Sequence, residues 1–262
     1  MLSKNKIKWI RSLEHKKFRK ETGCFLAEGN KLVADMLPYF ECEFLLSESS
    51  WLATQGDIRT KEHVIAEKGD IARASLLRNP QNVLAVFKQP DYILDTEMLK
   101  TKLSLVLNGI QDPGNLGTII RLADWFGIET IICSPDTADI YNPKTMQATM
   151  GALARVRTHY LNLPDFFKNM EEAGNSAFPI YGTFLEGENP YQKDLSPTGL
   201  IVMGNEGNGI SSEIESFITQ KIHIPSYPPQ SETSESLNVA VATAIICAEF
   251  RRQHSENGKA AF

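Results

Sequence analysis

Polar residues with catalytic potential gather in three glycine-containing stretches of the C-terminal part of the chain. The first stretch, residues 108–117, reads Asn-Gly-Ile-Gln-Asp-Pro-Gly-Asn-Leu-Gly and follows an apolar run. Its glycines allow a ligand to approach the backbone, and the start of the following helix is a natural anion site. A tight turn alone explains the glycines. It explains less well why Asn115 and Arg121 place an amide and a guanidinium at the start of that helix.

The second stretch, residues 203–210, reads Met-Gly-Asn-Glu-Gly-Asn-Gly-Ile and also follows an apolar run. No Gly-Lys-Ser/Thr follows, and the glycine spacing differs from the dinucleotide-binding fingerprint, so the pattern argues against ATP and NAD. Glu206 is either a solvated turn residue or a carboxylate that pairs with Arg121 and fixes its orientation.

The third stretch begins at Ile224-Pro225, continues through a polar loop to Glu235, and leads into Ser-Leu-Asn-Val and a run of small residues. This pattern predicts a buried helix over residues 236–252. Ser234 or Ser236 is the expected N-cap. Asn238 would then lie in the first turn of the helix, where a buried amide needs hydrogen-bond partners.

Composition places the chain among ordinary globular proteins. Its 262 residues carry 27 Lys and Arg against 32 Asp and Glu, and 42% are hydrophobic. The longest nearly apolar stretch, residues 239–248, is too short to cross a bilayer. The first twenty residues lack the apolar segment and cleavage site that are typical of a secretory signal, so we expect a cytoplasmic protein. The four cysteines and five histidines lack metal-binding or disulfide spacing, which predicts reduced, partly buried thiols and no metal site.

Charge is distributed unevenly along the chain. Residues 1–20 contain eight basic side chains and one acidic one, although the whole chain is acidic. Ile7, Ile10 and Leu13 recur at helical spacing, so this basic arm (residues 1–20) is expected to form an amphipathic helix. Its charges are either a solvated helix face or phosphate contacts to nucleic acid. The candidate RNA-binding lysines are Lys4, Lys8, Lys16 and Lys20.

The order of predicted elements indicates two domains, residues 1–95 and 96–262. In the first we expect a small α/β unit with helices at 30–37 and 49–54 and strands at 44–46 and 83–87. In the second, strands alternate with helices, which predicts a parallel sheet with ligands at the carboxyl ends of its strands. The expected strands are 103–107, 130–133, 156–160, 179–183, 200–203 and 221–224. The expected helices are 118–126, 143–154, 164–172, 211–217 and 236–252.

Together and in this order, the three stretches resemble the SpoU (TrmH-type) family of the SPOUT superfamily of RNA methyltransferases. The family motifs run roughly as Asp-Pro-x-Asn-x-Gly-x-x-x-Arg, Gly-x-Glu-Gly-x-Gly and Ser-Leu-Asn-Val, and the match covers about residues 103–252. Residues 25–29 and 79–81 also look like the family's RNA substrate-binding domain. One departure is the loop at residues 226–235, which is a few residues longer than expected.

The resemblance implies an α/β fold with a C-terminal trefoil knot that binds S-adenosylmethionine, and a homodimer. It implies methyl transfer to a ribose 2′-hydroxyl. The residues implied to surround that hydroxyl are Asn115, Arg121, Glu206, Ser236 and Asn238. The residues implied to hold the cofactor are Met203, Gly204, Asn205, Gly209, Ile224 and Leu237. Arg121 is either a general base or a group that positions an RNA phosphate.

Several functions stay open from the sequence alone. The extra N-terminal domain favours ribosomal RNA as the substrate over transfer RNA. A catalytically silent RNA-binding protein with the same fold is a further alternative, although the polar positions of all three motifs are intact. A nucleotide-dependent oxidoreductase would need a dinucleotide fingerprint that the sequence lacks.

Overall fold

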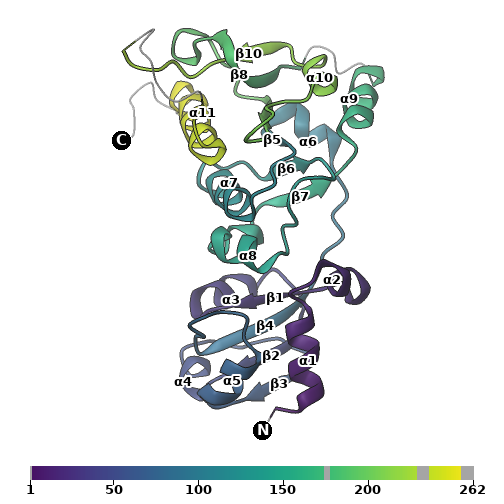
Figure 1. The fold of residues 1–262 in the computed structure, drawn as a ribbon, viewed down its shortest axis with the longest axis vertical. Coiled ribbons are helices and arrows are strands. Elements are labelled where there is room, and N and C mark those ends of the chain that lie inside the picture. The colour runs from purple at the N-terminus through teal and green to yellow at the C-terminus, as the bar shows by residue number, and fades with distance from the viewer. Residues whose placement is uncertain (1, 174–177, 229–235, 255–262) are drawn as a thin grey trace. The chain divides into compact units, whose positions relative to one another are not determined.

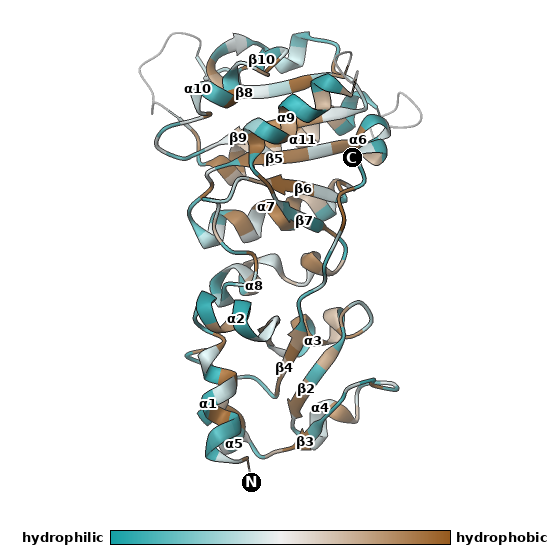
Figure 2. Cartoon of the chain, turned by 90° about the vertical axis from the view of Figure 1, so that its right-hand side faces the viewer, coloured by the Kyte–Doolittle hydropathy of each residue, from teal (hydrophilic) through white to brown (hydrophobic). Residues whose placement is uncertain are grey.

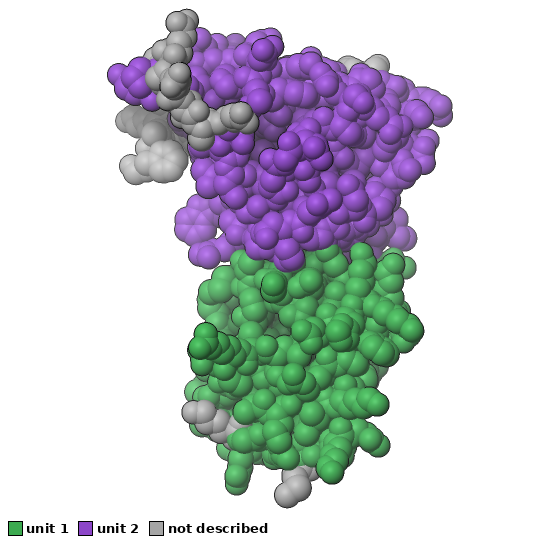
Figure 3. All heavy atoms as spheres, viewed as in Figure 1, with its two compact units in different colours: residues 1–91, 139–154 green, residues 92–138, 155–262 purple. Residues whose placement is uncertain are grey.

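The computed structural model describes residues 2–173, 178–228 and 236–254. Its contacts form two compact units, which Figure 3 colours separately. Unit 1 comprises residues 1–91 and 139–154, and unit 2 comprises residues 92–138 and 155–262. The division of the chain into domains at residues 95 and 96 stays a prediction.

Unit 1 is built on a four-stranded mixed sheet with the order β1-β4-β2-β3 (Figure 1). The central pairs β1/β4 and β4/β2 are antiparallel, and the edge pair β2/β3 is parallel. The strands are β1 (Cys24–Glu28), β2 (Cys42–Ser47), β3 (His63–Ile65) and β4 (Val83–Lys88). The helices are α1 (Lys4–Ser12), α2 (Lys16–Thr22), α3 (Asn30–Met36), α4 (Ser49–Leu52), α5 (Lys68–Ala74) and α8 (Pro143–Thr149), with the 3₁₀ turn η1 (Ala152–Ala154).

The basic arm forms two helices, α1 and α2, where a single amphipathic helix was predicted. The amphipathic pattern of its first part is confirmed. Ile10 and Leu13 are fully buried in the core of unit 1, and Ile7 packs against that core. The four candidate RNA-binding lysines are exposed. Arg19 differs from them because it is only 2% exposed and donates to the carbonyl oxygens of Leu13 and Glu14. The guanidinium of Arg19 therefore stabilises the turn between the two helices.

Residues 139–154 complete unit 1, although they lie between two strands of unit 2 in the sequence. Arg19 Nη2 donates to Asp139 Oδ2 at 2.7 Å, and the rings of Phe25 and Tyr141 stack with centroids 4.6 Å apart. Gln147 Nε2 also donates to the carbonyl oxygen of Glu28 at 2.8 Å. Charge, aromatic packing and hydrogen bonding thus all bind this segment to β1 and α2.

Unit 2 contains a six-stranded sheet with the order β10-β8-β9-β5-β6-β7, in which every neighbouring pair is parallel. This arrangement confirms the predicted α/β fold with a parallel sheet. The strands are β5 (Leu103–Asn108), β6 (Thr130–Cys133), β7 (Arg157–Tyr160), β8 (Ile180–Glu188), β9 (Gly199–Gly204) and β10 (Gln220–Ile222). The helices are α6 (Thr96–Thr101), α7 (Pro113–Trp125), α9 (Leu163–Glu172), α10 (Ser212–Glu215) and α11 (Val239–Gln253), with the 3₁₀ turn η2 (Pro190–Gln192).

Helices cover both faces of this sheet. On one face of the sheet, Val106 of β5 and Val202 of β9 pack against apolar residues of α6, α9 and α10. On the other face, α7 and α11 pack against each other. The central strands β5 and β9 are apolar along almost their whole length, as expected for strands buried on two faces. Figure 2 shows hydrophobic residues in the strands and hydrophilic ones on the outer faces of helices such as α9. No helix in the described part of the chain could span a membrane.

Candidate active site

The first loop lies between β5 and α7, and its local geometry follows from three residues. Asp112 caps α7 by accepting from the backbone N of Asn115 at 2.7 Å, and Pro113 occupies the first turn of the helix. Gly109 has φ +75°, in the left-handed region that glycine adopts most easily. A Cβ at Gly109 would also lie 3.0 Å from Asp136 Oδ2. The loop is therefore a tight turn that fixes where α7 begins.

The second loop leaves β9 and closes on itself. The backbone N of Asn205 donates to the carbonyl oxygen of Gly209 at 2.9 Å, and the reverse bond measures 3.0 Å. A Cβ at Gly204 would lie 2.3 Å from the backbone of Gly209, so only glycine fits beneath the closed loop. Asn205 also binds the first loop, because its Nδ2 donates to the carbonyl oxygen of Gly109 at 2.7 Å.

The third loop ends at a helix start that differs from the prediction. Asn238 is itself the N-cap of α11, and its Oδ1 accepts from the backbone N of Ala240 at 3.0 Å and Val241 at 3.3 Å. The helix therefore begins at residue 239, three residues later than predicted. Ser236 is exposed before the cap. The alternative cap, Ser234, lies outside the described residues.

One chain of hydrogen bonds joins the three loops. Asn238 Nδ2 donates to Asn115 Oδ1 at 3.0 Å, and Asn115 Nδ2 donates to Glu206 Oε1 at 2.9 Å. Because both atoms of the Asn115 amide have a partner, its orientation is fixed. The structure thus brings together three of the five predicted catalytic side chains, from positions up to 123 residues apart.

Arg121 lies exposed on α7, beyond this hydrogen-bond chain. Among the described residues it forms no ion pair or side-chain hydrogen bond, so the alternative in which Glu206 pairs with Arg121 is wrong. Asn115 donates a hydrogen bond to the Glu206 carboxylate instead, because it lies in the first turn of α7, nearer to the second loop. The guanidinium is left accessible to a ligand.

The predicted cofactor-binding residues lie at or near the carboxyl ends of β9 and β10 and before α11. Met203 is buried, so only its backbone could contact a ligand, whereas Leu237 is 48% exposed and Ile224 is partly exposed. Strand β8 lies between β9 and β10, which the sequence alone did not predict. Its Thr183 donates to the carbonyl oxygen of Val202 at 3.3 Å. This neighbour of β9 was not predicted, because the order of strands along the chain does not determine their order in a sheet.

The cysteines take no part in this site. All four are free and buried, where partly buried thiols were predicted, and burial raises the pKa of each thiol, for Cys247 to about 12. Thiols with raised pKa values are poor nucleophiles at neutral pH. The described residues contain no cluster of three or more potential metal ligands.

Comparison with known proteins identifies the family. Residues 102–248, more than half of the chain, match the model of the SpoU rRNA Methylase family. The protein belongs to this family. Residues 4–85 of this SpoU-family protein also match the MRM3-like substrate binding domain. These matches confirm the family predicted from the three loops.

Individual relatives of this SpoU-family chain agree with that assignment. It is 31% identical over 249 residues to the 23S rRNA (guanosine(2553)-2′-O)-methyltransferase RlmP of Bacillus subtilis (strain 168), covering 94% of this chain and 96% of the relative. A putative TrmH-family RNA methyltransferase from Porphyromonas gingivalis has a similar structure, with TM-score 0.87, 41% identity and coverage of 97% and 99%. An AdoMet-bound rRNA methyltransferase from Sinorhizobium meliloti has TM-score 0.78, 30% identity and coverage of 97% of both chains.

Proposed function

We propose that this protein transfers a methyl group from S-adenosylmethionine to a ribose 2′-hydroxyl of ribosomal RNA. The observation that carries the proposal is the hydrogen-bond chain from Asn238 through Asn115 to Glu206, which assembles the three family motifs into one polar site. The B. subtilis relative is named for the same reaction on a guanosine of 23S rRNA. The N-terminal match to a substrate-binding domain supports ribosomal over transfer RNA.

The loops beyond β9 and before α11 fit S-adenosylmethionine by their chemistry. The backbone around Gly204 offers polar groups at a strand end, and the accessible side chains of Ile224 and Leu237 offer apolar contact for an adenine ring. The AdoMet-bound structure of the S. meliloti relative supports this assignment. The proposed cofactor-binding residues are therefore Met203, Gly204, Asn205, Gly209, Ile224 and Leu237. The cofactor supplies an activated methyl group, so the protein has to bind, align and desolvate the reactants.

Asn115, Glu206, Ser236 and Asn238 would surround the ribose. The oriented amide of Asn115 and the carboxylate of Glu206 offer a donor and acceptors for sugar hydroxyls, and the exposed hydroxyl of Ser236 stands two residues before the Asn238 cap. These side chains would contribute by fixing the reacting oxygen in line with the methyl donor.

Arg121 would bind an RNA phosphate next to the reacting ribose. A guanidinium stays protonated in proteins, which argues against a role as general base and for a role as anion ligand. Its exposure and the lack of an ion-pair partner among the described residues support that role. The same positive charge would stabilise negative charge that develops on the attacking oxygen.

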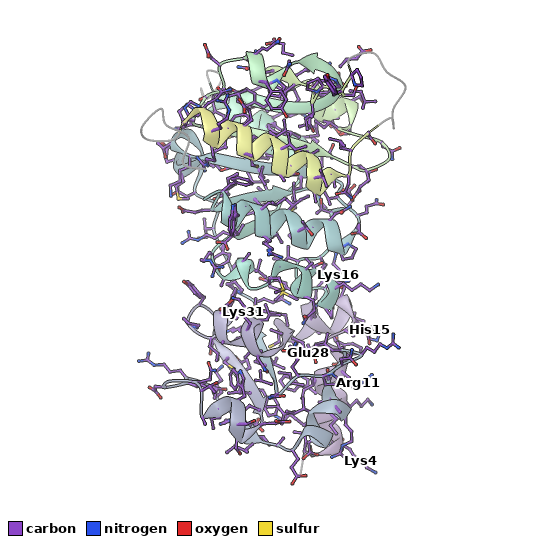
Figure 4. The ribbon with its side chains drawn as sticks, turned by 90° about the vertical axis from the view of Figure 1, so that its left-hand side faces the viewer. Lys4, Arg11, His15, Lys16, Glu28 and Lys31 are labelled. Carbon is purple, nitrogen blue, oxygen red and sulfur yellow. The ribbon has the colours of Figure 1, made fainter. Side chains whose placement is uncertain are left out.

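The basic arm would contact RNA phosphates other than the one bound by Arg121. Figure 4 shows Lys4, Arg11 and Lys16 along one side of unit 1. Lys4, Lys8, Lys16 and Lys20 are exposed and free to contact phosphates. Arg19 is excluded from this set because its charge is buried against Asp139.

Exposed apolar residues support a homodimer. Trp125 at the end of α7 is 81% exposed and Val241 on α11 is 50% exposed, and these two helices pack against each other. Large exposed apolar side chains on one helical layer are typical of protein contacts. The free thiols and the ribosomal RNA substrate support a cytoplasmic location, and the trefoil knot implied by the family remains part of the same proposal.

Two measurements test the proposed function. Calorimetry with S-adenosylmethionine should show binding, and with NAD should show none. Mass spectrometry of ribosomal RNA from cells lacking the protein, after incubation with protein and isotope-labelled cofactor, should find the label on a ribose 2′-oxygen. Label on a base, label only in transfer RNA, or no binding at millimolar cofactor would overturn the proposal.

A further inference from the structure

Unit 1 contains a polar cavity of about 390 Å³. None of the predicted RNA-binding lysines is among its lining residues. It is formed by the start of α3, by α4 with the turn that follows it, and by the residue before β4. In the view of Figure 4, Lys31 of this cavity lies away from Lys4, Arg11 and Lys16 of the basic arm. Its lining includes Asn30, Lys31, Trp51, Thr54, Gln55 and Asn82.

A network of backbone-anchored bonds holds the cavity walls in place. The backbone N of Asn30 donates to Gln81 Oε1 at 2.8 Å, and Asn30 Oδ1 accepts from the backbone N of Asn82 at 3.2 Å. The backbone N of Glu48, just before α4, donates to the carbonyl oxygen of Asn82 at 2.9 Å. The three wall segments are therefore joined before any ligand arrives, which lowers the entropy cost of binding.

The floor and the rim differ in chemistry. Trp51 is only 4% exposed and its indole Nε1 donates to the carbonyl oxygen of Asn30 at 3.3 Å, so it forms a fixed floor. At the rim, the Lys31 ammonium lies 2.5 Å from Asp35 and remains 70% exposed. This ion pair offsets the lysine charge, so the cavity is not a site for an anion alone.

Two carboxamides remain available inside the cavity. Gln55 Nε2 donates to Thr54 Oγ1 at 2.8 Å, which leaves its Oε1 without a partner among the described residues. The side chain of Asn82 forms no hydrogen bond to any described residue. A carboxamide offers a donor and an acceptor side by side, which matches the edge of a nucleobase.

We infer that this cavity binds one unpaired nucleobase of the RNA substrate, with Gln55 and Asn82 reading its edge. Sequence-specific RNA recognition uses splayed-out bases that are hydrogen-bonded on their edges. The cavity is open to solvent, so a base splayed out from the RNA could enter it, and its lining is rich in amides and poor in free charge. The inference rests on the proposed RNA substrate and adds a base-reading site to it.

The test is the double variant Gln55→Ala with Asn82→Ala, measured for binding to ribosomal RNA purified from cells lacking the protein. Neither side chain bonds to another secondary-structure element, so the fold should persist. We expect RNA affinity to fall about 5- to 30-fold, in line with the loss of one or two base contacts. The dependence of affinity on salt concentration should stay unchanged, because no phosphate contact is removed.

The matched control is Gln192→Ala, which removes an exposed carboxamide from η2 in unit 2. It should leave RNA affinity unchanged, and both variants should keep the wild-type affinity for S-adenosylmethionine and the wild-type melting temperature. Unchanged RNA affinity in the double variant, or a loss accompanied by a smaller salt dependence, would overturn the base-reading site. The binding assay needs no methyl transfer, so failure of the proposed reaction would be seen separately.

Discussion

The Nδ2 atom of Asn238 donates to the Oδ1 atom of Asn115 at 3.0 Å, across 123 residues of sequence. The same Asn238 side chain uses its Oδ1 to cap α11. One amide therefore starts a helix and orients the central residue of the polar chain. The helix start and the geometry of the site cannot vary independently.

Separating these two roles is possible with Asn238→Asp. Aspartate keeps the capping oxygen, so the free energy of unfolding should change little. It loses the donor to Asn115 and adds a negative charge near Glu206, so methyl transfer should fall roughly 10-fold or more. Asn238→Ala should lose transfer and also about 0.5–2 kcal/mol of stability. Urea unfolding and transfer of labelled methyl groups measure both; equal stability loss in both variants would contradict the cap assignment.

Arg121→Ala should abolish methyl transfer while changing the affinity for S-adenosylmethionine little. The guanidinium stands on α7, apart from the loops that are proposed to hold the cofactor. Single-turnover transfer and calorimetry provide the two readings. Arg121→Lys, which keeps the charge but not the planar fork, should recover part of the activity. Transfer within a few-fold of wild type in Arg121→Ala would show that the phosphate role is wrong.

Reversing Lys4, Lys8, Lys16 and Lys20 to Glu should weaken RNA binding and flatten its salt dependence. Each lost phosphate contact should reduce the slope of log affinity against log salt by roughly 0.7–0.9. Cofactor affinity should not change. The single variant Lys16→Glu should show a smaller effect in the same direction. Its control is Lys168→Glu, which reverses one exposed charge on α9. An RNA affinity that is unchanged across the salt titration would identify the lysines as a solvated helix face.

Asp139→Ala should destabilise the protein by about 3–5 kcal/mol, because it leaves the charge of Arg19 buried without its partner. The matched control is Asp124→Ala, which breaks a bidentate but more exposed pair with Arg155 and should cost under about 1 kcal/mol. Denaturant unfolding of both variants gives the comparison. Similar losses in the two variants would show that Arg19 does not depend on Asp139.

Glu28 should make stability fall as pH rises through the mildly acidic range. Burial raises the pKa of this carboxyl above its ordinary value of 4.5, against the opposing bonds from Ser75 and Leu76. The folded state therefore holds a proton that the unfolded state releases. The stabilising contribution is complete below 4.5 and is lost as pH rises through the folded pKa. The difference between wild type and Glu28→Gln in unfolding free energy should show this trend, and a flat difference would contradict it.

Much of unit 2 could be predicted because its chemistry is local. Strands β5 and β9 are apolar runs, and the glycines and proline of the first loop predicted a turn that leads into a helix. Helix α7 nevertheless begins at Pro113, five residues before the predicted start at residue 118. Strand β8 was predicted too short, because its later residues are polar and join the sheet through pairing of Glu188 with Ile222. The start of α11 was placed too early, because Ser236 and Asn238 are both good capping residues.

Long-range partners were beyond the reach of the sequence. Helix 143–154 was expected as one piece, but α8 ends at Thr149, and Met150 adopts a left-handed conformation before η1. Nothing in the local pattern shows that Arg19 pairs with Asp139, 120 residues away. The sequence shows the basic residues of the arm but not that Arg19 is buried, so it could not predict that Arg19 is unable to contact RNA.

Because residues 139–154 belong to unit 1, the chain passes between its two units three times, after residues 91, 138 and 154. No single cut can therefore release unit 1 intact. A fragment ending at residue 91 would keep Arg19 and Phe25 but lose Asp139 and Tyr141. Exchange of unit 1 between relatives, by recombination or by engineering, requires two transplanted segments whose buried contacts match.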